Sequence, residues 1–329
     1  MDILVIGLGS MGKRRIRLLC RFKQIGNIIG VDFKENRRKD SENMFSCKTY
    51  TDIHAALAEN PQIKCAFVCT SPLSHSGLIT EALQYGLHVF TEINLVSDGY
   101  ERNISLAKQK SRVLFLSSTF YYREEIRFIR EKIKGKGNLN YLYHIGQYLP
   151  DWHPWENYNE FFVGDKRTNG CREIMAIEFP WIIGTFGMVR NYNVIANNIS
   201  ELNIPYKDNY FIQLEHESGN KGVLAIDVVS PKAVRNLEVY GENLYFSWNG
   251  SPAGLEYFDF ENKTMKRVCP YDDIEQLEGY SNFIIENAYQ AEIQEFLALI
   301  KGKNRPEYGF EEDLEILKLI DQIEGLDHE

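Results

Sequence analysis

The sequence lacks an excess of positive charge, because its 37 lysines and arginines are outnumbered by 46 aspartates and glutamates, giving a net charge of −9. It also lacks an apolar run of the length that crosses a membrane, and no basic segment precedes a long apolar one at its start. These absences remove general electrostatic support for a nucleic-acid or anionic-membrane partner. We therefore predict a cytoplasmic protein with no nucleic-acid partner and no membrane partner.

Motifs of several catalytic classes are missing as well. The six cysteines include no CxxC pair, no two histidines are spaced i, i+4, and neither HExxH nor GxSxG occurs. These gaps argue against a metal centre and against a serine hydrolase, so we predict no metal. Scattered cysteines without pairing motifs are typical of free thiols in a cytoplasmic protein, and we expect most of them to be buried.

Hydrophobic patterning divides the chain into two parts. Its 329 residues are sufficient for two domains. Up to about residue 118, short runs that are apolar on both faces alternate with helical spacing, as in a parallel sheet between helices. Later segments are longer and alternate apolar with polar residues, which is typical of an antiparallel sheet with one covered face. The predicted strands are 3–6, 28–31, 65–69, 87–90 and 113–116, then 141–149, 209–216, 222–229, 235–240 and 255–260, with late helices at 282–300 and 311–324.

The predicted fold class is therefore α/β followed by α+β. Residues 1–118 are expected to form a doubly wound parallel sheet. Residues 119–329 are expected to form a second domain with an open, mostly antiparallel sheet that helices cover on one face.

Residues 7–12 read GLGSMG and match GxGxxG. The motif follows a predicted strand, opens a predicted helix and is followed, twenty positions after its last glycine, by Asp32 at the end of the next strand. That context is typical of the Rossmann dinucleotide-binding turn, in which the glycines allow the tight turn, the approach of the pyrophosphate and close helix–strand packing. The predicted diphosphate-binding residues are Gly7, Gly9, Ser10, Met11 and Gly12.

Asp32 is predicted to bind the adenosine ribose hydroxyls, and its charge would repel a 2′-phosphate, which favours NAD over NADP. Arg37 and Arg38 lie just beyond and keep NADP open. The loop after the strand at 65–69 is also placed to line the dinucleotide, because ligands bind at the carboxyl ends of parallel strands. Its predicted cofactor-binding residues are Thr70, Ser71, Pro72 and His75, of which His75 either contacts the cofactor or caps the following helix.

Two segments stand out beside the change to a β-rich second domain: GLGSMGKRR at 7–15 and TSPLSHSGLITEALQYGLHVFTE at 70–92. Together with the ending from Tyr289 to Glu324, they resemble the GFO/IDH/MocA (glucose–fructose oxidoreductase, inositol dehydrogenase and rhizopine catabolism) oxidoreductase family. The resemblance implies a Rossmann domain, an open sheet that often forms a dimer interface, and reversible hydride transfer between NAD(P) and a hydroxyl-bearing carbon of a sugar, sugar nucleotide or cyclitol. We accordingly expect a homodimer or homotetramer.

The chain departs from the resemblance where proton transfer is expected. Family members carry Glu-Lys-Pro after the fifth strand, and the lysine serves in acid–base chemistry; here the triplet is Glu92-Ile93-Asn94. The family's GGxLxDxGxHxxD motif aligns with 169–181, where Ile174 replaces the aspartate and Glu178 the histidine. Glu92 is kept and is predicted to lie at the cofactor, whereas the proton-transfer group must come from elsewhere.

The segment 147–178 contains several replacements for a base that takes the hydroxyl proton. Glu173 and Glu178 lie in an apolar helical stretch, where desolvation would raise the pKa of their carboxyls. Alternatively, Glu173 forms an ion pair with Arg172 or Arg167, and Glu178 is a buried carboxylate satisfied by the backbone or a lysine. His153 and Lys166 are further catalytic candidates. The alternatives are that His153 is a loop histidine packed between two tryptophans and that Lys166 is an ordinary exposed lysine.

The same segment offers substrate contacts. Trp152 and Trp155 suit stacking on a sugar or base, and Arg167 and Arg172 suit a phosphate or carboxylate. Arg123 either contacts substrate or stabilises the junction between the two domains. The leading interpretation is an NAD-dependent oxidoreductase with relocated acid–base groups. The alternatives are a non-catalytic NAD or sugar sensor or partner protein, and an enzyme that recycles tightly bound NAD in epimerisation, dehydration or glycoside cleavage.

Overall fold

The computed structural model describes residues 1–154, 156–277, 281 and 283–326. The chain forms two compact units. The first unit contains residues 1–118 and 289–317, and the second contains 119–288 and 318–329. The change of pattern near residue 118 thus coincides with a division between units, and a stretch near the C-terminus returns to the first unit.

The first unit is built on a six-stranded parallel sheet in the order β3-β2-β1-β4-β5-β6. Its strands are β1 (Ile3–Ile6), β2 (Ile28–Val31), β3 (Lys48–Tyr50), β4 (Cys65–Val68), β5 (His88–Thr91) and β6 (Leu114–Leu116). Its helices are α1 (Ser10–Leu19), α2 (Glu35–Phe45), α3 (Ile53–Glu59), α4 (Pro72–Gln84) and α5 (Tyr100–Lys110), joined by most of α8 (Glu286–Ile300) and the first half of α9 (Phe310–Glu324). The strand order reverses between β1 and β4, and ligands bind at the carboxyl ends of strands at such a point.

An aromatic cluster fixes α8 on this sheet. Phe67, Phe90 and Phe115 stack across three neighbouring strands, with ring centroids 4.6 and 5.0 Å apart. Phe296 of α8 meets Phe67 and Phe90 edge-on at 5.4 and 5.7 Å. All four rings are fully buried, and buried aromatic pairs of this geometry stabilise a core beyond the area that they bury.

The second unit contains an eight-stranded sheet in the order β14-β13-β12-β11-β7-β10-β9-β8, in which the described pairs are antiparallel except for β7 with β10. Its strands are β7 (Asn140–Gly146), β8 (Val189–Asn197), β9 (Asn209–His216), β10 (Lys221–Asp227), β11 (Val234–Gly241), β12 (Leu244–Trp248), β13 (Leu255–Asp259) and β14 (Thr264–Arg267). Its helices are α6 (Glu124–Ile133) and α7 (Gly170–Phe186), with the short 3-10 helices η1 (Thr119–Tyr122), η2 (Leu149–Asp151), η3 (Tyr158–Glu160), η4 (Phe162–Gly164) and η5 (Lys166–Thr168).

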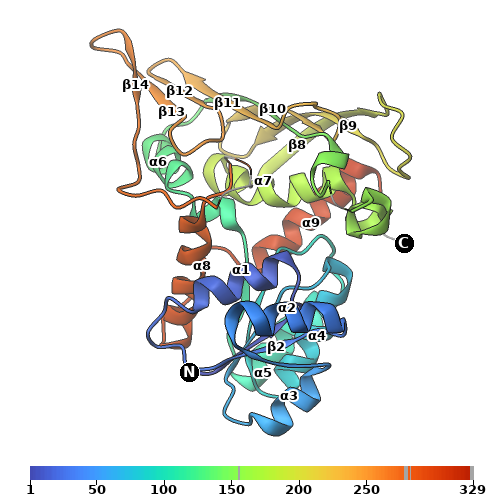
Figure 1. Cartoon of the computed structure of the whole chain (residues 1–329). Helices are drawn as coiled ribbons and strands as arrows, with labels where there is room; N and C mark the ends of the chain where they lie inside the picture. Colours follow the sequence, from blue (N-terminus) through green and yellow to red (C-terminus); the bar gives the residue numbers. More distant parts are fainter. Residues whose placement is uncertain (155, 278–280, 282, 327–329) are drawn as a thin grey trace. The chain divides into compact units, whose positions relative to one another are not determined.

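Helices α6 and α7 lie against one face of this sheet (Figure 1). Tyr141 and Tyr143 of β7 point to that face and are buried, with the Tyr141 ring stacked on Phe186 of α7 at 4.2 Å. Leu142, between them on the strand, points to the opposite face and is 44% exposed. The predicted fold class, including the open sheet covered on one face, is confirmed.

Most predicted elements are confirmed within a few residues, and the strands at 3–6 and 28–31 match in full. The strand predicted at 141–149 ends earlier, at Gly146, because the chain then turns into η2. All six cysteines are free thiols, but only Cys65, Cys69 and Cys171 are buried, fewer than predicted. No helix within the described ranges is long and apolar enough to cross a membrane.

Arg15 of α1 is completely buried and joins three parts of the first unit. Its Nε and Nη2 donate to Glu92, after β5, at 2.6 and 3.0 Å, and Nη2 also donates to Glu292 of α8 at 2.8 Å. Burial alone would lower the pKa of the Arg15 guanidinium, but the charges of Glu92 and Glu292 outweigh burial and raise it. One buried cation therefore holds two buried carboxylates.

The variant Arg15→Met tests this interaction. It leaves Glu92 and Glu292 buried without their cation, so we expect denaturant unfolding to show a loss of about 3–5 kcal/mol in the free energy of unfolding. The matched control is Lys39→Met, which removes an exposed ion pair with Glu35 at 2.6 Å and should leave the unfolding midpoint unchanged. Equal midpoints for Arg15→Met and the unaltered protein would contradict this account.

Candidate functional site

The turn between β1 and α1 has no room for side chains at two of its glycines. Gly7 has φ +92°, and a Cβ there would lie 2.7 Å from the carbonyl oxygen of Cys69. A Cβ on Gly12 would lie 1.9 Å from the carbonyl oxygen of Gly7. Gly9 differs, because a Cβ there would meet only the flexible end of Arg37, at 3.6 Å. The first and last glycines are required by the fold, whereas Gly9 faces a space that a ligand can approach.

Asp32, just after β2, anchors this turn. Its Oδ2 accepts a hydrogen bond from the N–H of Leu8 at 2.9 Å, and its Oδ1 accepts from the N–H of Lys34 at 2.8 Å. The side chain is almost fully buried, with Arg37 Nη1 at 3.7 Å from Oδ2. The carboxylate therefore stays beside the glycine turn, where it can accept from ribose hydroxyls.

These residues fit a dinucleotide. Ser10 and Met11 open α1, and its first turn carries no acidic residue that would repel a diphosphate. The first N–H groups of a helix have no acceptor within the helix, and the helix dipole adds positive potential there. The turn also lies at the carboxyl end of β1, at the point where the strand order reverses. A bound NAD(P) would thus be held by backbone donors at 9–12 and by Asp32.

His75 fixes the loop 70–75, which precedes and opens α4. Its ring is 2% exposed, with Nε2 at 2.9 Å from the carbonyl oxygen of Thr70 and Nδ1 at 2.7 Å from the side-chain amide of Asn94. Burial lowers the pKa of the imidazole, so the ring is neutral and carries one N–H. Both contacts are to oxygens that only accept, the Thr70 carbonyl and Asn94 Oδ1, so the single N–H of the ring donates to one of them. His75 lies within α4, whose N-cap is Ser71, and it contacts a carbonyl oxygen rather than an N–H at the helix start, so it does not cap the helix. Contact between His75 and the cofactor stays a prediction.

The loop after β5 offers no proton-transfer group at the position where the family carries lysine. Ile93 is half-buried, and Glu92 beside it is held by Arg15 at 2.6 Å. The Cys69 thiol also lies 3.7 Å from Glu92 Oε1. The retained glutamate therefore has a structural partner, and a direct role at the cofactor stays a prediction.

Glu178 of α7 is fully buried, and three donors satisfy its carboxylate. Tyr143 Oη and Trp181 Nε1 donate to Oε2 at 2.8 and 2.7 Å, and Arg235 Nε of β11 donates to Oε1 at 2.9 Å. A buried carboxylate was the alternative proposed from the sequence, but its partners are a tyrosine, a tryptophan and an arginine rather than the backbone or a lysine. Such a carboxylate is well suited to fixing Arg235.

Glu173, in the first turn of α7, differs from Glu178 in the hydrogen bonding of its carboxylate. Its Oε2 is buried and makes no hydrogen bond with the residues that the structure describes, although the side chain as a whole is only half-buried. Desolvation raises the pKa of this carboxyl to about 7, against a smaller opposing effect of the Arg235 charge. Glu173 therefore carries an exchangeable proton near neutral pH.

Arg172 does not pair with Glu173, which was one of the alternatives. Its guanidinium is 2% exposed and binds Asp321 and Glu324 of α9, both at 2.5 Å. Arg123 is also buried and occupied: it pairs with Glu125 and donates to the carbonyl oxygen of Phe283 at 2.6 Å. These contacts favour structural roles for both arginines, and their predicted contact with substrate stays untested.

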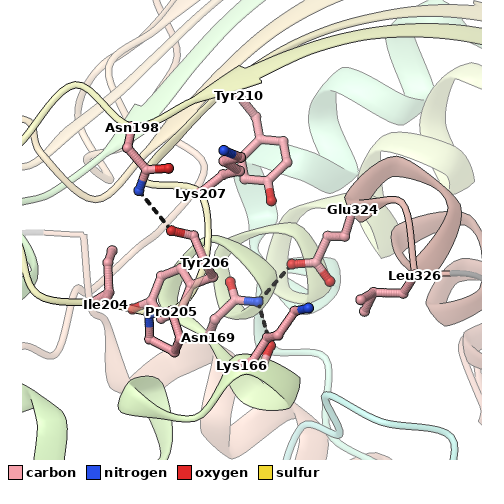
Figure 2. A pocket seen from close by; sticks show the side chains of 10 residues that line it. All are labelled: Lys166, Asn169, Asn198, Ile204, Pro205, Tyr206, Lys207, Tyr210, Glu324 and Leu326. Atoms are coloured by element: carbon pink, nitrogen blue, oxygen red, sulfur yellow. Dashed lines mark hydrogen bonds between the residues drawn. The ribbon is translucent and has the colours of Figure 1, made fainter.

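Lys166 lies at a pocket of about 370 Å³ in the second unit (Figure 2). Asn169, the N-cap of α7, lies beside it and donates to the Lys166 carbonyl oxygen at 3.0 Å and to Glu324 at 2.7 Å. Across the pocket, the Asn198 side chain donates to the Tyr206 carbonyl oxygen at 2.8 Å. Lys166 itself is exposed, as the simpler alternative predicted.

The remaining candidates do not gather at one point. His153 stacks on Phe161 with ring centroids 4.7 Å apart, and its Nδ1 lies 3.3 Å from Glu156. Trp152 donates its indole N–H to the carbonyl oxygen of Gln147 at 3.1 Å. Arg167 is exposed. Trp155 lies outside the described residues.

Arg235 was missed by the sequence reasoning, although a signal for it existed. In the predicted strand at 235–240, Arg235, Leu237 and Val239 alternate with polar residues and so share the covered face. A cation in register with an apolar face indicates a buried partner, which is Glu178 here.

Residues 1–118 match the family model described as an oxidoreductase family with an NAD-binding Rossmann fold, GFO/IDH/MocA. The resemblance noted in the sequence is thereby confirmed over residues 1–118. Biliverdin reductase A of Mus musculus is 30% identical over 139 residues, which cover 41% of this chain and 45% of that protein. The chain thus matches less than half the length of this curated relative.

Solved structures of two dehydrogenases share the fold over nearly the whole chain. Levoglucosan dehydrogenase in complex with NADH has a TM-score of 0.80 at 13% identity and covers 99% of this chain and 96% of its own. The UDP-N-acetylglucosamine 3-dehydrogenase of Acidithiobacillus ferrooxidans has a TM-score of 0.76 at 15% identity, covering 99% and 97%. At these identities the likeness concerns the fold alone.

Gly9→Ala separates coenzyme binding from folding. The added methyl group has space in the free protein, so the unfolding midpoint should not change, but it occupies the approach of the diphosphate. We expect the affinity for NADH, measured by the fluorescence of the bound coenzyme, to fall at least about tenfold. Gly77→Ala in α4, where no atom lies within 4 Å of the new Cβ, should bind as the unaltered protein does. Unchanged NADH affinity in Gly9→Ala would refute this placement of the diphosphate.

Proposed function

We propose that this protein is an NAD-dependent oxidoreductase that transfers a hydride to or from a hydroxyl-bearing carbon of a sugar, sugar nucleotide or cyclitol. The unit of residues 1–118 and 289–317 binds the coenzyme, and the unit of residues 119–288 and 318–329 binds the substrate. The observation that carries the proposal is the turn at Gly7–Gly12, closed to side chains at both ends and open at Gly9, with Asp32 beside it. Support for the substrate class comes from the two dehydrogenases of similar fold, which are named for levoglucosan and a UDP-sugar.

The preference for NAD over NADP follows from Asp32. Its carboxylate lies where the ribose hydroxyls are expected, and it would repel a 2′-phosphate. Arg38 does not offset this charge for a ligand, because its Nη1 donates to the carbonyl oxygens of Asp32 and Phe33 at 2.8 and 3.1 Å. Arg37 remains the group that could accommodate NADP, since it is partly exposed and only 3.7 Å from Asp32.

Proton transfer is assigned to the segment 147–178, with Glu173 as its first candidate. When bound, the nicotinamide ring supplies or accepts the hydride. In the oxidative direction, the Glu173 carboxylate takes the hydroxyl proton as the substrate carbonyl forms, and in the reductive direction the protonated acid returns it. Its pKa of about 7 suits both directions near neutral pH. His153 and Lys166 are the next candidates, because both are accessible, whereas Glu178 is held by three donors.

A non-catalytic NAD or sugar sensor is the second candidate, and Ile93 is the observation that favours it. No group at that position can move a proton, and Glu92 is occupied by Arg15. The third candidate is an enzyme that recycles tightly bound NAD within one turnover.

We further propose that the protein is cytoplasmic and associates with itself through the open face of the second-unit sheet. Leu142 and Val223 are cross-strand neighbours on that face, as are Phe211 and Ile195. Their exposed fractions are 44, 39, 50 and 66%. Contiguous apolar surface of this kind is typical of protein interfaces.

A coenzyme-linked activity screen tests the three candidates. Purified protein is dialysed and then mixed with NAD⁺ and a panel of sugars, sugar nucleotides, sugar acids and cyclitols. An oxidoreductase forms NADH with at least one of them. Tight NAD binding without any change in nicotinamide absorbance supports the sensor instead, and NAD that resists dialysis supports internal recycling.

Glu173→Gln tests the proton path through its pH dependence. The raised pKa means that the folded state favours the protonated acid, so the stability it contributes is complete below the ordinary value of 4.5 and is lost as pH rises through about 7. The variant should therefore unfold with less pH dependence between about pH 5 and 8. Its oxidative kcat should fall about 100-fold and lose the limb that rises near pH 7.

Glu160→Gln, an exposed carboxylate of the same segment, serves as the control and should keep both the rate and the profile. A rising limb near pH 7 that persists in Glu173→Gln would assign the proton to another group.

A further inference from the structure

A second pocket, of about 610 Å³, lies at the end of β7 and the start of β11. Each polar side chain that lines it carries at least one donor group, and two of them, Arg235 and Lys232, are cations. No aspartate or glutamate belongs to the lining within the described part of the chain. A cavity with two cations and no carboxylate at its surface is suited to an anion.

Arg235 is held in one orientation at this pocket. Its Nε is bound to Glu178, and its guanidinium lies between the rings of Phe120 and Phe283, with centroids at 4.7 and 5.3 Å. Its side chain is 16% exposed. Arg235 makes its ion pair with Glu178 through Nε, and its two Nη groups donate no hydrogen bond to any described residue. The edge of the guanidinium that carries these two groups is therefore available to a ligand. That edge matches the two oxygens of a carboxylate or phosphate.

Asn249 adds a second directed donor. Its Oδ1 already accepts hydrogen bonds from the N–H and the hydroxyl of Ser251, at 3.0 and 2.7 Å. The amide NH2 is consequently the group left for a ligand. Because Glu178 offsets part of the charge of Arg235, recognition depends on these oriented hydrogen bonds as well as on the charge of the cavity.

We infer that this pocket binds the carboxylate or phosphate group of an acidic small molecule, held by the Nη edge of Arg235 and the amide of Asn249. On the proposed function, the molecule is the substrate, which is then a hydroxylated acid such as a sugar acid or sugar phosphate rather than a neutral sugar. Glu178 is the positioning residue that fixes the arginine.

Isothermal titration without coenzyme tests the inference independently of hydride transfer. The probes are glucuronate, glucose 6-phosphate and glucose, which share one ring and differ in the charged group. We expect at least one acid to bind about tenfold or more tightly than glucose, and the tighter of the two identifies the group as carboxylate or phosphate. Equal affinity for all three, or no binding of either acid up to about 20 mM, would overturn the inference.

Two variants locate the binding. Arg235→Lys keeps a charge but loses the forked edge, and Asn249→Asp keeps both hydrogen bonds from Ser251 while turning the free donor into an anion. Each should weaken binding of the preferred acid at least about tenfold without affecting glucose. The exposed Arg190, paired with Glu215 at 2.7 Å, provides the control Arg190→Lys, which should not change the affinity.

A purely structural Arg235 would give a different pattern. Arg235→Lys would then lower the melting temperature while Asn249→Asp bound the acid as tightly as the unaltered protein, and that result would overturn the inference. Acid binding in this pocket combined with no coenzyme turnover would support the inference and count against the proposed function.

Discussion

The backbone turn between β1 and α1 is the constraint on which the rest of the first unit depends. A side chain at Gly7 or Gly12 would collide with backbone oxygens at 2.7 and 1.9 Å, so α1 can begin only directly against the sheet. This close packing aims the helix N-terminus at the carboxyl edge of β1 and brings the N–H of Leu8 within 2.9 Å of Asp32. The same geometry that closes the turn to side chains leaves donors that suit a diphosphate.

Buried ion pairs determine which charged residues remain free for chemistry. Glu92 has a structural role beside Ile93, because it pairs with the buried cation Arg15, which also pairs with Glu292. In the second unit, Arg172 is bound by α9 and Glu178 by Arg235. Glu173 is left with a buried oxygen that has no partner among the described residues, and desolvation raises the pKa of this carboxyl to about 7.

Local sequence pattern was sufficient to predict the parallel sheet and the glycine turn of the first unit. Strands such as β1 and β4 are apolar on both faces, and GLGSMG between a strand and a helix is typical of a dinucleotide-binding turn. It failed for β3, β8 and β14, which are edge strands with exposed or half-exposed side chains. It also failed for the inner strand β12, which has only five residues. It also could not predict the partners of buried charges: Arg15 lies 277 residues from Glu292, and Arg235 lies 57 residues from Glu178. Periodicity predicts which face a residue occupies, whereas the identity of its partner depends on long-range packing.

Calorimetric titration of the unaltered protein with each reduced coenzyme tests the central claim most directly, since it depends on no substrate and no variant. Backbone donors at 9–12 and the buried Asp32 together require NADH to bind in the micromolar range, with NADPH weaker by about tenfold or more. Absence of heat for both coenzymes would contradict the claim that this turn holds a dinucleotide.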